Sequence, residues 1–296
     1  MTTIDQLLEQ KKVLIADGAW GTELSRRGLE PGEAPESWVL RQPDAVREVA
    51  QGYVDAGAEI ILTDTFGGSR FKLSKSDLED QVAEINRRAV ELSQDAAGDA
   101  ALVFASIGPT GEFMEPLGLV SEQEMIETFG EQVEAMVAGG TDGILVETMT
   151  DLGEAKGALL AAREHFDGPV VVSMTFDRGP KGYATMMGVT PEHAAEELQA
   201  AGADIVGSNC GHGIENMIEV IDLMSGATDL PLWAKPNAGM PQLVDGDTVF
   251  TQSPEETAAH FAELAGAGAR IIGGCCGTTP EHIRALVEAR DEMFAD

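Results

Sequence analysis

The chain has three cysteines, and their placement indicates a metal site with one open position. Cys275 and Cys276 are adjacent in the run IIGGCCGTTP, and Cys210 lies in the run SNCG. Both runs lead from apolar residues to glycine, so the sulfur atoms stand at the ends of expected strands with few side chains around them. Thiolates placed in this way can converge on one soft metal ion such as zinc. Because a structural zinc site normally has four protein ligands, three would leave the fourth position to a substrate.

Two other interpretations of these cysteines are open. A single cysteine is often only a small buried hydrophobe, although the shared setting of all three favours a metal. Cys275 and Cys276 would alternatively be a redox-active pair, but they lack the two-residue spacer of the usual redox motif. We therefore expect a metal site.

The composition of the chain restricts its partners. Its 296 residues include 51 acidic and 19 basic side chains, which gives a formal net charge of −32. Such a chain repels nucleic acids and anionic membrane surfaces, so we expect small molecules or proteins as partners. An odd number of cysteines, two of them adjacent, does not fit a secreted disulfide framework. The N-terminus has no targeting pattern and no apolar run has the length of a membrane span, so we expect a cytoplasmic protein.

Eight short apolar runs recur along the chain, each followed by a longer segment with helical spacing. Their near-continuous Val, Ile and Leu content is typical of strands that are buried on both faces of a parallel sheet. The expected strands cover residues 13–16, 59–63, 102–106, 143–146, 170–174, 204–207, 232–234 and 270–273. Eight strand–helix units over this length favour a single (β/α)8 barrel over an open doubly wound sheet. Without a low-complexity linker, one domain over residues 1–296 is the simplest organisation.

The expected helices have start and stop signals of their own. Thr190-Pro191 and Ser253-Pro254 are typical of a capped first turn. Glycines follow amphipathic stretches such as residues 45–56 and 122–138, and we expect them to end helices in the left-handed conformation. These glycines are Gly57, Gly139, Gly140, Gly202, Gly226 and Gly268.

The barrel prediction locates an active site, because these sites form at the carboxyl ends of barrel strands. The expected strand ends carry polar groups as well as cysteines. They are DGAWGT from Asp17, DTFGG from Asp64, Glu147-Thr148, Asn209-Cys210-Gly211, KPNAG from Lys235 and GCCG from Gly274. A barrel would therefore bring all three cysteines to one rim, with carboxylates and an amide beside them.

Six motifs extend over essentially the whole chain: DGAWGT (17–22), TDTFG (63–67), IGPTG (107–111), NCG (209–211), PNAG (236–239) and GGCCGTTP (273–280). Together they resemble the zinc-dependent homocysteine S-methyltransferases. The chain is most similar to the homocysteine-binding module of cobalamin-dependent methionine synthase, with the betaine-using and S-methylmethionine-using enzymes as more distant relatives. The resemblance implies a (β/α)8 barrel that methylates homocysteine to methionine.

The resemblance also implies the metal ligands, which are Cys210, Cys275 and Cys276 around zinc. Asn237 matches an asparagine whose side-chain oxygen can occupy the fourth zinc position before the substrate arrives, and a simple turn role is the alternative. His212 is not used by the family pattern, and its spacing from Cys210 is too short for the usual finger arrangement. We expect His212 at the rim.

The resemblance implies substrate-binding residues too. Glu147 matches the strand-end glutamate that binds the amino group of homocysteine, and Asp17 with the amide of Gly18 matches the loop that helps to hold the amino acid. Helix capping is the alternative role for a strand-end acid. A free thiol has a pKa of about 8.5 and is mostly protonated at neutral pH. Bound to zinc it would be a thiolate, ready to attack an activated methyl group in line.

The methyl donor is the least determined part of the prediction. The chain ends shortly after the eighth expected helix and shows no donor-binding module, so we expect methyl from methylcobalamin on a separate corrinoid protein. The alternatives are betaine, S-methylmethionine or another onium compound as direct donor, a different thiol acceptor, or a non-catalytic zinc- or thiol-binding barrel. An onium donor needs a pocket for its cation, often an aromatic one. Trp20, Trp38, Phe66 and Phe113 stand near expected rim loops, and Asp64 replaces an asparagine that is usual in the cobalamin-type enzymes.

Overall fold

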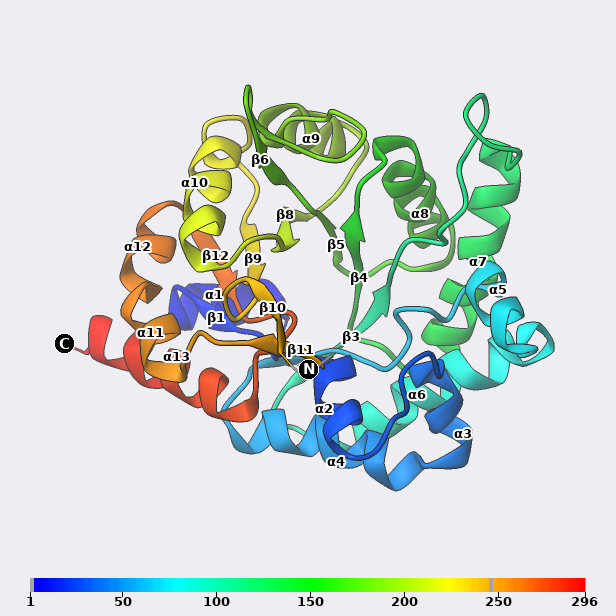
Figure 1. Ribbon diagram of the computed structural model, residues 1–296, viewed down its shortest axis with the longest axis horizontal. Helices are drawn as coiled ribbons and strands as arrows, with labels where there is room; N and C mark the ends of the chain where they lie inside the picture. The colour runs from blue at the N-terminus through cyan, green and yellow to red at the C-terminus, as the bar shows by residue number, and fades with distance from the viewer. Residues whose placement is uncertain (1–2, 245–246, 296) are drawn as a thin grey trace.

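Eight parallel strands form the centre of the computed structural model, which describes residues 3–244 and 247–295 (Figure 1). They are β1 (Leu14–Ile15), β2 (Ile60–Ile61), β3 (Leu102–Ile107), β4 (Gly143–Met149), β5 (Val170–Met174), β8 (Ile205–Cys210), β9 (Leu232–Pro236) and β12 (Ala269–Ile272). Their order around the sheet is β1-β12-β9-β8-β5-β4-β3-β2. A parallel bridge between Ala16 and Ile60 joins the two ends of this order, so the sheet closes on itself. The predicted (β/α)8 barrel and all eight predicted strands are confirmed.

Helices surround the barrel, and at least one follows every strand. They are α1 (Ile4–Lys11), α2 (Trp20–Arg26), α3 (Trp38–Arg41), α4 (Pro43–Asp55), α5 (Arg70–Leu73), α6 (Val82–Ala97), α7 (Glu122–Ala138), α8 (Leu152–His165), α9 (Pro191–Ala200), α10 (Ile214–Ser225), α11 (Pro254–Ala259), α12 (Phe261–Gly266) and α13 (Pro280–Met293). The predicted caps are present, since Thr190 begins α9 and Ser253 begins α11 with a side-chain hydrogen bond. Across the described residues, no helix combines the length and the apolar character that crossing a membrane requires.

The glycines at helix ends were predicted correctly in four of six cases. Gly57, Gly140, Gly202 and Gly268 have φ angles between 89° and 117°. Gly139 and Gly226 were predicted wrongly, because both are right-handed with φ of −76°. At the end of α7 the next residue, Gly140, takes the left-handed conformation instead. Gly139 permits close packing, since a Cβ there would lie 2.7 Å from the carbonyl oxygen of Arg87.

Two layers of apolar side chains hold the barrel together. The larger layer lies between the strands and the helices. The smaller layer includes at least one residue from each of the eight strands, and in it Phe104 stacks on Trp233 with ring centroids 6.4 Å apart. Ile4 and Leu8 of α1 belong to this inner layer, so α1 packs against the barrel interior.

Sequence reasoning missed α1 and two hairpins at strand ends. The hairpins are β6 (Asp177–Gly179) with β7 (Gly182–Ala184), and β10 (Pro241–Val244) with β11 (Asp247–Phe250). A capping box between Thr3 and Gln6 marks the start of α1 and was the available signal. The hairpin strands have three or four residues each, too few for a clear alternating pattern.

Replacing Phe104 by alanine should destabilise the fold by about 3–5 kcal/mol, because the change leaves a cavity in the inner layer. Urea unfolding of the purified variant measures this difference. Leu160→Ala is the control, since Leu160 is 40% exposed and its loss should change the free energy of unfolding by about 0.5 kcal/mol or less. Equal effects of the two substitutions would contradict the assignment of Phe104 to the inner layer.

Candidate active site

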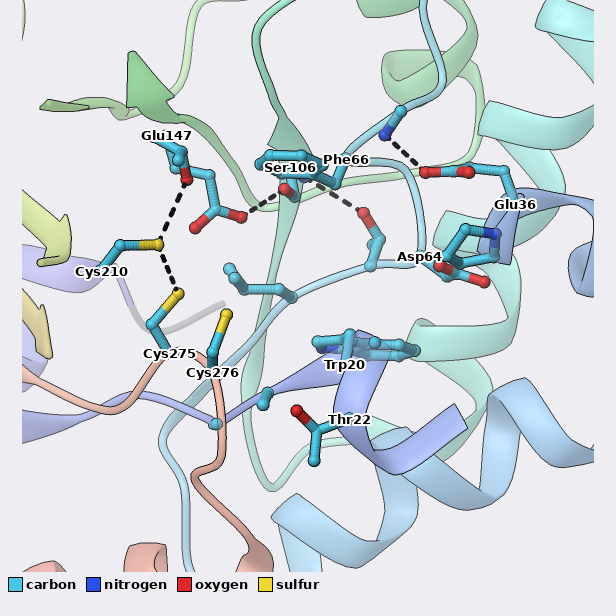
Figure 2. Close-up of a pocket in the computed structure, with 18 of the residues that line it drawn as sticks. Trp20, Thr22, Glu36, Asp64, Phe66, Ser106, Glu147, Cys210, Cys275 and Cys276 are labelled. Carbon is cyan, nitrogen blue, oxygen red and sulfur yellow. Dashed lines mark hydrogen bonds between the residues drawn. The ribbon is translucent and has the colours of Figure 1, made fainter. Parts of the chain in front are cut away.

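The structure brings the sulfur atoms of Cys210, Cys275 and Cys276 together at the carboxyl end of the barrel (Figure 2). Cys210 is the last residue of β8, and the two other cysteines lie in the loop after β12. The three Sγ atoms lie within 4.8 Å of one another, with 3.1 Å between Cys210 and Cys275. Zinc–sulfur bonds of about 2.3 Å put tetrahedral ligands roughly 3.8 Å apart, so the sulfur cluster has the dimensions of a zinc site.

Backbone contacts hold the cysteine loop against the end of β9. The amide of Cys275 donates to the carbonyl of Pro236 at 2.8 Å, and the carbonyl of Cys276 accepts from the amide of Ala238 at 2.9 Å. Gly274 has no room for a side chain, since a Cβ would overlap Thr278. The loop is therefore fixed in register beside the adjacent strand, which explains the glycine before the two cysteines.

Close approach drives the pKa values of the three thiols apart. Hydrogen bonds with Cys210 and Cys275 lower the pKa of Cys276 to about 3. Hydrogen bonds with the same group of sulfur atoms, together with burial, raise the pKa of Cys210 well above its usual value. A thiolate forms most readily at Cys276, the most exposed of the three. A cation among the sulfur atoms would favour the ionised form of every thiol.

Glu147 of β4 lines the same cavity as the cysteines. Its carboxylate is buried and accepts a hydrogen bond of 2.5 Å from the hydroxyl of Ser106. Burial raises the pKa of Glu147 to about 7, and the nearby positive charge of Lys235 opposes this rise. An ammonium group beside Glu147 would restore the ionised carboxylate, so this residue is suited to bind an amine.

Asp17 is fully buried and lies outside the cavity lining. One carboxylate oxygen pairs with Nζ of Lys235 at 2.6 Å. The other accepts from the amide of Leu62 at 2.7 Å and from the indole of Trp20 at 2.8 Å. Burial alone would lower the pKa of Lys235, but the negative charges of Asp17 and Glu147 raise it. Both Asp17 oxygens are thus engaged within the protein.

The remaining predicted site residues occupy different places. Gly18 lines the cavity, and its amide donates no hydrogen bond within residues 3–244 and 247–295. The side chain of Asn237 donates to the carbonyl of Gly211 at 2.8 Å, while its Oδ1 is buried without a partner in the described part of the chain. His212 lies outside the sulfur cluster, with Nε2 3.6 Å from Asp177.

Residues 14–290 match the homocysteine S-methyltransferase family. The chain belongs to this family. It is 30% identical to methionine synthase of Mycobacterium leprae (strain TN) over 94% of its length, and 29% identical to methionine synthase of Mycobacterium tuberculosis (strain ATCC 25618 / H37Rv) over the same share. The alignments cover 24% and 25% of those proteins, so the chain spans about a quarter of the relatives it matches.

Solved structures of the homocysteine methyltransferase MmuM from Escherichia coli share the fold of this family member. The metallated form matches with a TM-score of 0.80 and 24% identity, over 95% of this chain and 97% of that one. The apo form matches with a TM-score of 0.74 and 25% identity, over 96% and 98% of the two chains. The family barrel therefore extends over nearly all of the chain.

The cavity of this homocysteine S-methyltransferase family member has a volume of about 510 Å³ and two chemically different ends (Figure 2). The cysteines and Glu147 form one end. Glu36 and Asp64 form the other, with the rings of Trp20 and Phe66 between the ends. Sequence reasoning did not identify Glu36, because glutamate is usually exposed. Here it lies in a short 3-10 helix (Pro35–Ser37), is buried, and accepts a hydrogen bond from the amide of Gly67.

Of these two carboxyl groups, Asp64 has the fewer hydrogen-bond partners among the described residues. It is 3% exposed, and its Oδ2 has no hydrogen-bond partner among the described residues. Burial raises the pKa of Asp64 well above its usual value, and the charge of Glu36 adds to the shift. Burial raises the pKa of Glu36 as well, against the opposing effect of the Gly67 amide. One proton shared by two adjacent acids relieves their repulsion.

Asp64→Asn should stabilise the protein more at pH 8 than at pH 5, by on the order of 1–3 kcal/mol. Because the folded state raises the pKa of Asp64, the stability from its protonation is complete below the unfolded pKa of about 4 and is lost as pH rises through the folded pKa. Asparagine does not ionise, so its contribution to stability does not change with pH in this way. Urea unfolding at both pH values tests this, with the exposed Asp99→Asn as control. A pH-independent difference would contradict the shift.

Proposed function

We propose that this chain transfers a methyl group to the sulfur of homocysteine, with zinc bound by Cys210, Cys275 and Cys276. The observation that carries the proposal is the convergence of three sulfur atoms at the end of a cavity that also holds the Glu147 carboxylate. Sulfur ligands suit zinc, and a fourth ligand position is left for a substrate thiol. Family membership agrees with this chemistry, and its product, methionine, links the reaction to methionine biosynthesis.

The side chains around the sulfur cluster fit a zinc ion. The unpartnered Oδ1 of Asn237 is a buried acceptor, and its residue adjoins the strand end that pairs with the cysteine loop. Such an oxygen gains a partner if it binds the metal before homocysteine does. When bound, zinc would lower the pKa of the substrate thiol and keep its sulfur nucleophilic at neutral pH.

The protein groups around the sulfur cluster would hold the amino acid in place. Glu147 binds the ammonium group, and the hydroxyl of Ser106 orients the carboxylate for that contact. The amide of Gly18, which has no acceptor among the described residues, is a donor for the substrate carboxylate. Asp17 acts indirectly, because it orients the indole of Trp20 and keeps Lys235, which lines the cavity, positively charged. Holding the sulfur and the methyl donor in line supplies much of the acceleration in such a transfer.

For the donor, we favour methylcobalamin carried by a separate corrinoid protein. The support comes from the two methionine synthases, which are relatives at about 30% identity. The chain spans about a quarter of them, so a donor module would lie outside the matched segment. The cytoplasmic location expected from the sequence stays a prediction.

The second candidate donor is a small onium compound such as S-methylmethionine or betaine. Asp64 favours it, because an unpartnered buried carboxyl oxygen beside aromatic rings is suited to a cation. The cavity volume of about 510 Å³ also leaves room for a second small molecule beside homocysteine. The non-catalytic alternative, a barrel that binds zinc without turnover, predicts that neither kind of donor is used.

Cys275→Ser should lose both zinc and methyl transfer. Zinc sites in finger peptides bind with about 10–16 kcal/mol over four ligands, so losing one sulfur should weaken zinc binding by ~100-fold or more. Metal analysis after competition with a chelator measures the affinity, and methionine formation measures turnover. His212→Ala is the control and should keep zinc, because His212 lies outside the cluster. Full activity in a zinc-free Cys210→Ala protein would eliminate the mechanism.

The donor can be identified by supplying homocysteine with methylcobalamin, S-methylmethionine or betaine in separate assays for methionine. A corrinoid donor predicts turnover with methylcobalamin only, and little effect of Asp64→Asn. An onium donor predicts turnover with an onium compound and a kcat/KM about tenfold lower in Asp64→Asn, since a buried charged contact is worth about 1.5–3 kcal/mol. Zinc binding without methionine from any donor would favour the non-catalytic alternative.

A further inference from the structure

The buried carboxamide of Asn209 connects the ends of three strands beneath the sulfur cluster. Its Oδ1 accepts from the amide of Thr148 at 2.8 Å and from the hydroxyl of Ser173 at 2.7 Å. Its Nδ2 donates to the hydroxyl of Thr148 at 2.7 Å and to the sulfur of Cys210 at 3.4 Å. Thr148 belongs to β4, Ser173 to β5 and Cys210 to β8. Asn209 is 0% exposed, so all of these contacts are shielded from water.

Two of the residues that Asn209 contacts have a strained backbone. Thr148 has a φ angle of 62° and Cys210 one of 63°, in the left-handed region that non-glycine residues avoid. The left-handed conformation brings Cβ too close to the following carbonyl oxygen, so other contacts must stabilise it here. Thr148 directly follows Glu147, and Cys210 directly follows Asn209. One left-handed residue therefore lies next to Glu147 in the chain, and the other carries the sulfur of Cys210.

Resting on the proposed function, we propose that Asn209 is a positioning residue that holds Glu147 and the sulfur of Cys210 at the separation homocysteine requires. Its two hydrogen bonds to Thr148 hold the turn beside Glu147. Its N–H group fixes and polarises the sulfur of Cys210. One rigid amide thus couples the amine end of the site to the metal end.

This role makes a prediction about ligand discrimination. Homocysteine has an amine and a thiol at a fixed number of bonds, so it binds well only if Glu147 and the metal are correctly separated. 4-Mercaptobutyrate is the same molecule without the amine, so it does not depend on that separation. Loss of Asn209 should therefore weaken homocysteine binding more than 4-mercaptobutyrate binding, whereas general damage would weaken both alike.

The test compares zinc-loaded wild type, Asn209→Ala and Asn209→Asp by calorimetric titration with the two thiols. Asn209→Asp keeps the size and the Oδ1 acceptor and loses the N–H donors, so it covers the case in which the alanine variant folds poorly. We expect homocysteine affinity to fall about tenfold or more in both variants, and 4-mercaptobutyrate affinity by about threefold or less. Asn86→Ala is the matched control, since Asn86 is another fully buried asparagine that bonds to Gly68 and Val82 instead.

A second readout uses cobalt(II) in place of zinc. Removing an N–H donor from a sulfur ligand raises the energy of its lone pairs, so the sulfur-to-cobalt absorption band should move to longer wavelength in Asn209→Asp and stay in place in Asn86→Ala. Equal losses for both thiols with an unmoved band would overturn the positioning role.

Failure of the proposed function would look different, because wild type itself would then bind neither thiol or fail to prefer homocysteine. Glu147→Gln provides the reference for lost amine recognition. It should lose the preference for homocysteine while keeping the cobalt band, and a preference that persists in Glu147→Gln would count against the assigned amine site.

Discussion

The structure at the carboxyl end of the barrel depends on the buried ion pair between Asp17 and Lys235. Two charges taken out of water are stable only when paired and hydrogen-bonded, and removing one partner leaves an uncompensated charge in the protein interior. Here the pair joins the end of β1 to β9, and the second Asp17 oxygen connects to the end of β2 and to Trp20. Three strands and one wall of the cavity thus share a single electrostatic anchor.

The cavity above this anchor separates two kinds of chemistry. The sulfur atoms and the Glu147 carboxylate lie at one end, and the buried carboxyl groups of Glu36 and Asp64 lie at the other. Aromatic rings between them keep the centre of the cavity largely apolar. If a small-molecule donor binds as proposed, this division would let each end of the cavity hold a different reactant, with the reacting atoms between them.

Much of this arrangement was predictable from sequence, for identifiable reasons. Buried parallel strands are short continuous apolar runs, so the eight strands and their rim could be recognised, and cysteines distant in sequence could be assigned to one rim. The direction of a side chain beyond a strand end depends on barrel register. For that reason the sequence did not reveal that Asp17 pairs with Lys235 outside the cavity lining, or that Glu36 becomes buried against Gly67. Asn209 was visible in its motif, but its contacts join residues of three strands and have no local signal.

The left-handed backbone of Thr148 and Cys210 bears on how such a protein can evolve. Glycine would relieve the strain at Thr148, because it adopts positive φ angles without a steric penalty. Glycine there would also remove the hydroxyl that Asn209 contacts and loosen the turn beside Glu147. If Asn209 positions Glu147 through Thr148 as proposed, selection for thermal stability and selection for catalysis would act in opposite directions at this position. Threonine at this position would make the barrel less stable than glycine would. It would also keep the contact between the ends of β4 and β8 ordered.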